Sequence, residues 1–269
     1  KYKIAYIFNV HFCLYLYCDN KSKIRMKTLV IIPSRLSATR LPGKPLLKIN
    51  GLSMISHVFK KAQDANIGEV FVAAEDQEIV DDVKKNGGEA IITGNNHQTG
   101  TDRIFEVIKE LNRTDIELVM NLQGDEPLLN IEDIQNLNKQ MISSGNELGT
   151  LASKINQKEV LKNQDVVKVI TNKSLDLSEF PLALNFLRKS EKNIKNIYHH
   201  LGIYCYHIET LKKFVSLKRT SNEIKNRLEQ LRALDNNINV NVALAKSSSI
   251  GVDTKEDYVA IKKIMEYKS

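Results

Sequence analysis

Three positively charged residues lie in one short loop near the start of the chain. Arg35, Arg40 and Lys44 belong to the stretch SRLSATRLPGKPL (34–46), which directly follows the apolar run TLVIIP (28–33). The loop lacks the G-x-x-x-x-G-K-[ST] pattern of a Walker A loop. Its glycine and prolines shape a turn in which the cations can bind the several charges of a triphosphate; the alternative is a solvated surface loop.

Two acidic residues also follow apolar runs. Asp125 lies in NLQGDEP (121–127), and Asp253 lies in GVDTKED (251–257), behind the last apolar run of the chain. Mg²⁺ prefers one or two carboxylates together with substrate phosphates and water. The alternatives are that Asp125 caps the helix that follows it and that Asp253 is a turn residue. Combined with the basic loop, the two acids indicate Mg²⁺-assisted attack on a nucleoside triphosphate.

The elements that must position these residues alternate from Met26 onward between short apolar runs and amphipathic segments. This alternation is typical of βα units in a mostly parallel sheet. The expected strands are 28–33, 69–74, 89–93, 117–123, 148–155, 166–171, 198–207 and 239–245. The expected helices are 53–66, 102–111, 130–142, 223–234 and 254–267. In open α/β sheets, ligands bind beyond the carboxyl ends of the strands, where the basic loop and both acids are expected.

The expected domain organisation is one α/β domain over residues 26–269. Its section from about 150 to 210 is richer in strands and alternates less regularly, so we interpret it as a smaller β-rich subregion. The net charge of the chain is +7, but residues 1–25 contribute +4 and leave +3 for the rest. Without a basic stripe, this charge argues against nucleic acid as a partner.

Residues 1–25 have a basic start and an apolar middle, which resembles a signal peptide. Polar residues interrupt the apolar run, and no small-residue cleavage site follows it. We interpret the segment as an extraneous N-terminal extension; the alternative is a weak membrane anchor or signal. Outside it the only cysteine is Cys205, which indicates a reducing compartment, and we expect the cytoplasm. The apolar run of about 15 residues in the extension is short for a spanning helix, so no stable membrane association is expected.

Six motifs in order resemble one known family. They are IIPSRLSATRLPGKPLLKING, HQTGTDRI, NLQGDEP, HLGIYCYH, LEQLRAL and GVDTKED. Together they resemble the CMP-Kdo synthetases, the 3-deoxy-manno-octulosonate cytidylyltransferases, from Met26 to the C-terminus. The resemblance implies a Rossmann-like nucleotidyltransferase fold similar to glycosyltransferase A, with a β-rich dimerisation subregion and a homodimer. It also implies Mg²⁺-dependent transfer of CMP from CTP to the anomeric hydroxyl of Kdo, with release of pyrophosphate, for lipopolysaccharide biosynthesis.

The resemblance assigns roles to residues of this chain, position by position. The implied catalytic residues are Arg35 and Lys44, and the implied metal ligands are Asp125 and Asp253. The residues implied to bind the nucleotide are Arg40, Gln98, Thr101 and Arg103. The residues implied to bind the sugar are Gln123, Arg188, His200, Tyr204, Glu229 and Gln230, with Arg188 as the partner of the sugar carboxylate.

The chain departs from the family pattern at three places, of which the mildest is Thr99 in HQTGT, where Ser is usual. The second strand of the family usually ends in Ala-Thr-Asp-Asp, where this chain has Ala-Ala-Glu-Asp (73–76). The segment ALNFLRKSEKNIKN (183–196) lacks the family's Tyr-Phe-Ser-Arg and Pro-Ile-Pro pattern, which affects the role of Arg188 and the sugar preference. The alternatives are therefore a nucleotidyltransferase for a related acidic sugar, such as 8-amino-Kdo, or a non-catalytic nucleotide-binding relative.

Overall fold

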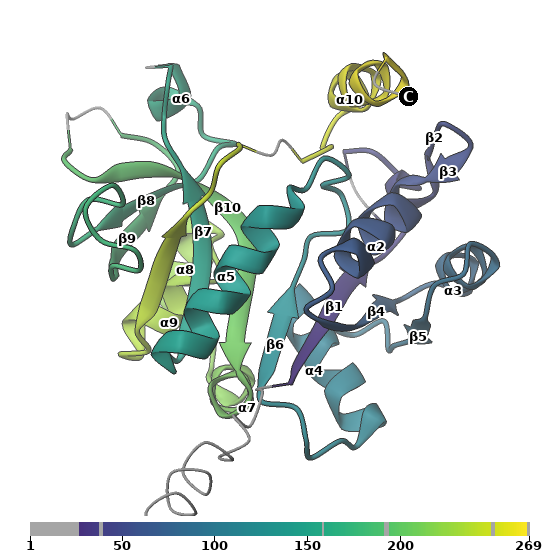
Figure 1. Cartoon of the computed structure of the whole chain (residues 1–269), viewed down its shortest axis with the longest axis horizontal. Helices are drawn as coiled ribbons and strands as arrows, with labels where there is room; N and C mark the ends of the chain where they lie inside the picture. The colour runs from purple at the N-terminus through teal and green to yellow at the C-terminus, as the bar shows by residue number, and fades with distance from the viewer. Residues whose placement is uncertain (1–26, 38–39, 158, 191–193, 249–250, 268–269) are drawn as a thin grey trace, which may run out of the picture.

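The computed structural model describes residues 27–37, 40–157, 159–190, 194–248 and 251–267. The expected N-terminal extension, residues 1–25, lies outside these ranges. A mixed sheet forms the centre of the molecule, with strand order β11-β7-β10-β6-β1-β4-β5 and with β8 and β9 continuing from β10 (Figure 1). This arrangement confirms the predicted α/β class.

The strands of the sheet fall close to the predicted runs. They are β1 (Thr28–Ser34), β4 (Gly68–Ala74), β5 (Ala90–Ile92), β6 (Leu118–Asn121), β7 (Leu148–Ser153), β8 (Lys168–Thr171), β9 (Ala183–Leu187), β10 (Ile197–His207) and β11 (Val240–Leu244). A small hairpin, β2 (Lys48–Ile49) and β3 (Leu52–Ser53), follows the short 3-10 helix η1 (Lys44–Leu46). The predictions did not include β9 or this hairpin.

Strand β1 is the centre of the parallel part of the sheet. It pairs in parallel with β4 on one side and β6 on the other, whereas β10 runs antiparallel to β6 and β7. Because β1 and β6 point the same way, the segments that follow Ser34 and Asn121 leave the sheet at the same edge. The topology thereby places the basic loop beside the NLQGDEP motif, as predicted.

Helices cover both faces of the sheet. The helices α2 (Met54–Asp64), α3 (Gln77–Lys85) and α5 (Ile131–Ser144) pack on the face that carries Val30 and Ile32; α2 and α5 lie in front of the sheet in Figure 1. The opposite face, with Leu29 and Ile31, packs against α4 (Gly100–Leu111), α7 (Ile208–Ser216) and α9 (Leu231–Asp235). The side chains of β1 alternate between these two cores, as the pleat of a strand requires.

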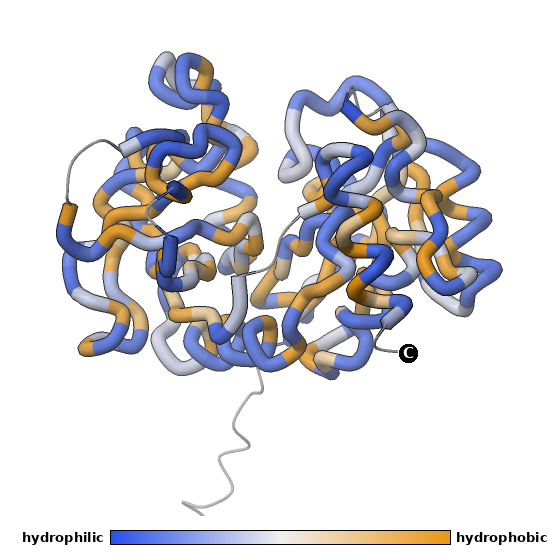
Figure 2. Tube along the Cα trace, turned by 90° about the horizontal axis from the view of Figure 1, so that it is seen from above, coloured by the Kyte–Doolittle hydropathy of each residue, from blue (hydrophilic) through white to orange (hydrophobic). Residues whose placement is uncertain are grey.

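The remaining helices lie at the periphery of the domain. They are the short α6 (Glu159–Lys162), α8 (Ser221–Asn226) and α10 (Lys255–Tyr267), which packs near β2. Viewed from above, hydrophobic and hydrophilic stretches alternate along the chain, as expected for elements that each bury one face (Figure 2). None of the helices in the described ranges has the length and apolarity needed to cross a bilayer.

The predicted helix over 223–234 is wrong, because the structure divides it into α8 and α9. Arg227 adopts a left-handed conformation with φ of 52° and ends α8. The turn that follows brings Arg232 back to Glu223, where two charge-assisted hydrogen bonds of 2.9 and 2.8 Å form. Hydrophobic periodicity continued through this turn, so sequence reasoning missed a break that a buried ion pair stabilises.

This buried pair predicts a large effect on stability. Burial opposes ionisation of Glu223, but the hydrogen bonds from Arg232 and Arg219 lower its pKa overall. Glu223→Gln leaves Arg232 buried without its carboxylate, so we expect the free energy of unfolding to fall by about 3–5 kcal/mol in urea denaturation. The matched control is Asp176→Asn, in an exposed pair with Lys154, which we expect to cost about 1 kcal/mol or less. Equal effects of the two variants would contradict this interpretation.

Candidate active site

The basic loop and the two acids meet at one edge of the sheet. Lys44 Nζ lies 2.6 Å from Asp125 Oδ2 and 3.3 Å from Asp253 Oδ1. Arg40 Nη2 lies 2.9 Å from the other carboxylate oxygen of Asp253. The Lys44 side chain is only 13% exposed, so its ammonium group is held between the acids rather than being free in solvent. Arg35 and Arg40 are exposed to solvent, whereas Lys44 is enclosed, so the basic loop contacts both acids although part of it lies at the surface.

A backbone hydrogen bond explains how residues so far apart in sequence come together. The Val252 amide donates to the Asp125 carbonyl oxygen at 2.9 Å, which fixes the segment before Asp253 against the Gly124–Asp125 turn. Gly124 is needed there, because a Cβ at this position would lie 3.1 Å from the Ile55 side chain and 3.2 Å from the Pro33 carbonyl oxygen. The close approach of the backbones thus brings the two carboxylates to one point.

The alternative roles considered for the two acids are not those found in the structure. Helix α5 is capped by Asn130, whose side chain accepts from the Glu132 amide, so Asp125 does not cap it. At α10, the Thr254 hydroxyl accepts from the Asp257 amide, and the Asp257 carboxylate accepts from the Thr254 amide. Thr254 and Asp257 therefore form a capping box at α10, and the carboxylate of Asp253 instead faces Lys44 and Arg40.

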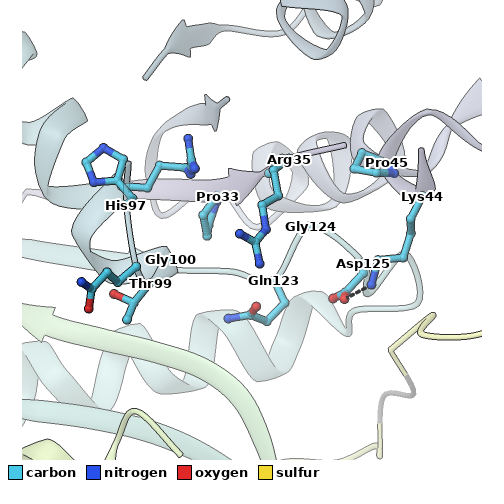
Figure 3. Close-up of a pocket in the computed structure, with 13 residues that line it drawn as sticks. Pro33, Arg35, Lys44, Pro45, His97, Thr99, Gly100, Gln123, Gly124 and Asp125 are labelled. Atoms are coloured by element: carbon cyan, nitrogen blue, oxygen red, sulfur yellow. Dashed lines mark hydrogen bonds and ion pairs between the residues drawn. The ribbon is translucent and has the colours of Figure 1, made fainter. Parts of the chain in front are cut away.

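A cavity of about 300 Å³ lies directly beside Lys44 and Asp125 (Figure 3). Arg35 extends from the end of β1 toward Gln123, on the opposite side of the cavity from His97 and Thr99. The predicted site residues that line this cavity are Arg35, Lys44, Gln98, Arg103, Gln123 and Asp125. We call it the nucleotide-side cavity.

Thr101, also predicted to bind nucleotide, does not line this cavity. It is 2% exposed at the start of α4. Its hydroxyl forms hydrogen bonds that lower the pKa values of Tyr206 and Glu229, although burial raises both pKa values overall. Thr101 therefore lies behind the wall of this cavity, where its hydroxyl contacts Tyr206 and Glu229.

Arg103 is held in part by Glu75, which belongs to the segment 73–76 that differs from the family pattern. Its guanidinium forms an ion pair with Glu75 and donates to the Thr93 hydroxyl and to the Gly94 carbonyl oxygen. The neighbouring Asp76 accepts from the Leu36 amide at 2.7 Å and so tethers the basic loop. The two acidic residues after β4 thus hold two parts of the nucleotide-side cavity in place: Glu75 holds Arg103, and Asp76 holds the basic loop.

The loop before α4 is fastened by Glu106. The Glu106 carboxylate accepts from the Gly94 amide at 3.1 Å and pairs with His97, a residue of the cavity wall. Burial opposes ionisation, yet the hydrogen bonds with His97 and Gly94 lower the pKa of Glu106 overall. These contacts set the position of Gln98, the neighbour of His97.

A second cavity of about 510 Å³ lies on the other side of Gln123. Gln123 lines both cavities, and its Nε2 donates to the Gly202 carbonyl oxygen at 2.9 Å. The predicted site residues that line this second cavity are Arg40, Gln123, His200, Tyr204, Glu229, Gln230 and Asp253. We call it the sugar-side cavity.

Burial holds two ionisable side chains of this cavity, His200 and Tyr204, in their neutral forms. Burial lowers the pKa of His200 to about 3, with a smaller contribution from His199, and raises the pKa of Tyr204 well above its usual value. The Nε2 of His200 lies 3.0 Å from the Thr150 hydroxyl. His200 is thus a neutral hydrogen-bonding group. Both it and His199 line the cavity although they are neighbours on β10; the irregularity of this strand lies beyond them, between Leu201 and Tyr204.

Glu229 stands out among the polar side chains of the sugar-side cavity. Burial raises its pKa, although hydrogen bonds from Thr101 and Thr99 and the charge of Arg232 oppose this shift. Its buried Oε1 has no hydrogen-bond partner among the residues that the structure describes. Such an atom is costly to bury unless it meets a ligand or water. Glu229 can therefore accept a hydrogen bond from a hydroxyl group in the cavity.

Arg188 is the predicted sugar residue that the structure does not bring to the site. It lines neither of the two cavities, and its guanidinium instead donates to the carbonyl oxygens of Gln164, Asn226 and Arg227. The break between α8 and α9 exposes two of these carbonyls, which an uninterrupted helix would have used internally. Because sequence reasoning expected that helix to continue, it could not foresee these partners.

The sequence matches the model of the family described as Cytidylyltransferase over residues 29–246. The 3-deoxy-manno-octulosonate cytidylyltransferase of Thermodesulfovibrio yellowstonii is 39% identical over 252 residues, which are 89% of this chain and 98% of that protein. A Rhodopseudomonas palustris protein of the same name is 41% identical over 232 residues, 86% of this chain and 94% of that one.

A solved structure shows a similar arrangement. It is a CMP:2-keto-3-deoxy-manno-octonic acid synthetase in complex with CTP, with a TM-score of 0.81 and 33% identity, covering 90% of this chain and all of that one. A 4-diphosphocytidyl-2C-methyl-D-erythritol synthase of Anaerococcus prevotii, with a TM-score of 0.60 and 14% identity, shares the fold.

Proposed function

Because this chain belongs to the cytidylyltransferase family, we propose that it transfers CMP from CTP to 3-deoxy-D-manno-octulosonate (Kdo) and releases pyrophosphate. The observation that carries the proposal is the meeting of Lys44, Asp125 and Asp253 between two cavities that share Gln123. One cavity would bind the nucleotide and the other the acidic sugar. The anomeric oxygen would form a bond to the α-phosphorus as the bond to the departing pyrophosphate breaks.

The basic loop would bind the triphosphate. Arg35 and Lys44 line the nucleotide-side cavity, and Arg40 lies at the border of the sugar-side cavity beside Asp253. Their charges would neutralise the phosphates and the charge that develops on the leaving pyrophosphate, which is the main requirement of phosphoryl-type transfer. Gln98 and Arg103, on the far wall, would contact the nucleoside.

The donor set of the site fits a magnesium ion. Asp125 and Asp253 each place an oxygen within 3.3 Å of the same cation, Lys44 Nζ. No group of three or more metal-ligating side chains occurs within the described residues, and Mg²⁺ is usually held by one or two carboxylates with substrate phosphates and water. Asp125 and Asp253 would therefore hold the ion, which supplies charge neutralisation at the phosphates when bound.

The sugar-side cavity would bind hydroxyl groups through neutral partners. His200 is buried, Tyr204 is half-buried, and both are neutral; Glu229 has a buried oxygen without a partner in the described chain. Gln123 and Gln230 add amide groups that can donate and accept. These groups suit a polyhydroxylated sugar, and the nearby Arg40 would attract its carboxylate.

A pyrophosphate-release assay tests the proposed activity. With CTP, Mg²⁺ and Kdo, we expect release that depends on all three, whereas ATP, GTP or UTP in place of CTP should give little. A side-by-side comparison with 8-amino-Kdo and other 3-deoxy-ulosonic acids identifies the preferred sugar. Tight CTP binding without pyrophosphate release for any sugar would instead support a non-catalytic nucleotide-binding relative.

We also propose that the enzyme is a cytoplasmic homodimer that serves lipopolysaccharide biosynthesis. Strand β9 pairs only with β8 in the described sheet, and its Leu184 is 60% exposed. An edge strand with an exposed leucine favours pairing with a second copy. We expect light scattering to give twice the 30.6 kDa mass of the chain, and Leu184→Lys to shift it toward the monomer. The control Ile264→Lys, on α10, should remain dimeric; a monomeric wild type would contradict the proposal.

A further inference from the structure

Lys168 is a fully buried lysine outside the residues assigned to the site. It lies on β8 with 0% exposure, and its Nζ donates to three backbone carbonyl oxygens: Asn163 at 2.5 Å, Val166 at 2.7 Å and Arg188 at 2.7 Å. No carboxylate of the described chain forms an ion pair with it. Its three donors are thus all used on backbone atoms.

Arg188, directly after the next strand β9, continues this pattern. Its Nε donates to the Asn226 carbonyl at 2.9 Å, its Nη1 to Gln164 at 3.2 Å and its Nη2 to Arg227 at 2.9 Å. The two cations together therefore join three segments: the loop 163–167, the end of β9 and the turn after α8. We call Lys168 and Arg188 the cation clamp.

Two of the clamped segments form walls of the sugar-side cavity. Residues from 163 to 167 line one side of it, and residues 228–230, directly after the clamped turn, line another. Both walls carry groups that would meet the sugar, among them Glu229 and Gln230. Because Lys168 holds the first wall and Arg188 bridges both, the clamp sets the distance between them.

A contribution to folding stability does not by itself explain why Lys168 is buried without a counter-charge. A buried charge without a counter-charge carries a large desolvation cost, and replacing buried ionic groups by apolar side chains is often neutral or stabilising. Burial lowers the pKa of Lys168, and the charge of Arg188 adds to this effect. The charge of Lys168 also reaches the cavity wall, since it contributes, after burial, to the lowered pKa of His199.

We propose that Lys168 and Arg188 are positioning residues that fix the two walls of the sugar-side cavity and thereby control affinity for the acidic sugar without touching it. This inference rests on the proposed function. Displacing a wall by about 1 Å should cost much of the sugar affinity, because small misplacements of binding groups have large effects. Neither wall segment lines the nucleotide-side cavity. Asp165 lies 3.8 Å from Arg40 of the basic loop, and Glu229 is hydrogen-bonded to Thr99, so we expect affinity for CTP to change much less than affinity for the sugar.

Steady-state kinetics of Lys168→Met separates this role from a general structural one. We expect KM for Kdo to rise about tenfold or more, while KM for CTP stays within about twofold, because only the sugar walls are displaced. Arg188→Met should show the same split. The matched control is Lys173→Met, an exposed lysine five residues along the chain, which should leave both constants unchanged. Equal rises in both KM values, or no change in either, would overturn the proposal.

Hydrogen exchange gives a readout that does not require turnover. In Lys168→Met, amide exchange should become faster in 163–167 and 226–230, while the basic loop and β1 exchange as in the wild type. If the wild-type protein releases no pyrophosphate, the proposed function fails, yet this measurement still decides whether the clamp exists. Unchanged exchange in both walls would refute the clamp. Should Lys168→Met fail to fold, Arg188→Lys, which keeps the charge but loses the three-donor fork, should show the same local change.

Discussion

Asp125→Asn is expected to lower kcat by about 10²- to 10⁴-fold, because a metal ion contributes several kcal/mol to transition-state stabilisation and each 1.36 kcal/mol corresponds to tenfold in rate. The Asp125 carboxylate lies 2.6 Å from Lys44 and, in the proposed function, shares a magnesium ion with Asp253. Asparagine keeps the shape of the side chain but removes its charge. Measuring kcat over a range of Mg²⁺ concentrations should also show a higher Mg²⁺ requirement in the variant.

Two further variants make this result specific. Asp253→Asn should behave like Asp125→Asn, since both carboxylates face the same ammonium group. Glu132→Gln removes an exposed carboxylate of α5 that pairs with Lys246 on the surface, and it should leave kcat nearly unchanged. Normal turnover in either aspartate variant would remove that residue from the metal site.

Lys44→Met is expected to lower kcat by about 10²- to 10³-fold, the usual effect of losing one preorganised charge-stabilising donor in an active site. The Lys44 side chain is 13% exposed and lies in the wall of the nucleotide-side cavity, so its ammonium group would act on the phosphates from a partly water-excluded position. Its removal also leaves two neighbouring carboxylates without a shared cation. We therefore expect KM for CTP to rise as well, measured by pyrophosphate release.

The matched control for Lys44→Met is Lys48→Met, four residues further along the chain and just outside the basic loop. Lys48 is exposed on β2 and lines neither cavity. Its replacement tests whether total positive charge, rather than the placed charge of Lys44, attracts the substrate. A similar loss in both variants would mean that the loop acts through its general charge.

Local sequence rules predicted the strands more accurately than the helices of this protein. The alternation of apolar and polar residues placed β1, β4 and β10 within a few residues of their observed bounds. The same reasoning joined α8 and α9 into one helix, because the apolar period continues through Arg227 while the backbone does not. Periodicity reflects which side chains are buried. The break depends on the ion pair between Glu223 and Arg232 and on carbonyl oxygens that accept hydrogen bonds from Arg188.

By itself, the sequence determined which groups are available for chemistry and at which strand ends they lie. A basic loop after β1 and acids after β6 and β11 follow from the hydrophobic pattern together with the rule that ligands bind at the carboxyl ends of strands. Only the tertiary structure decided which of them meet. Asp253 lies near Asp125 where the Val252 amide bonds to the Asp125 carbonyl oxygen and where Lys44 pairs with both carboxylates. Arg188 donates to two carbonyls at the end of α8 and to the carbonyl of Gln164. Contacts between residues distant in sequence depend on the packing of whole elements, and no local pattern of residues encodes that packing.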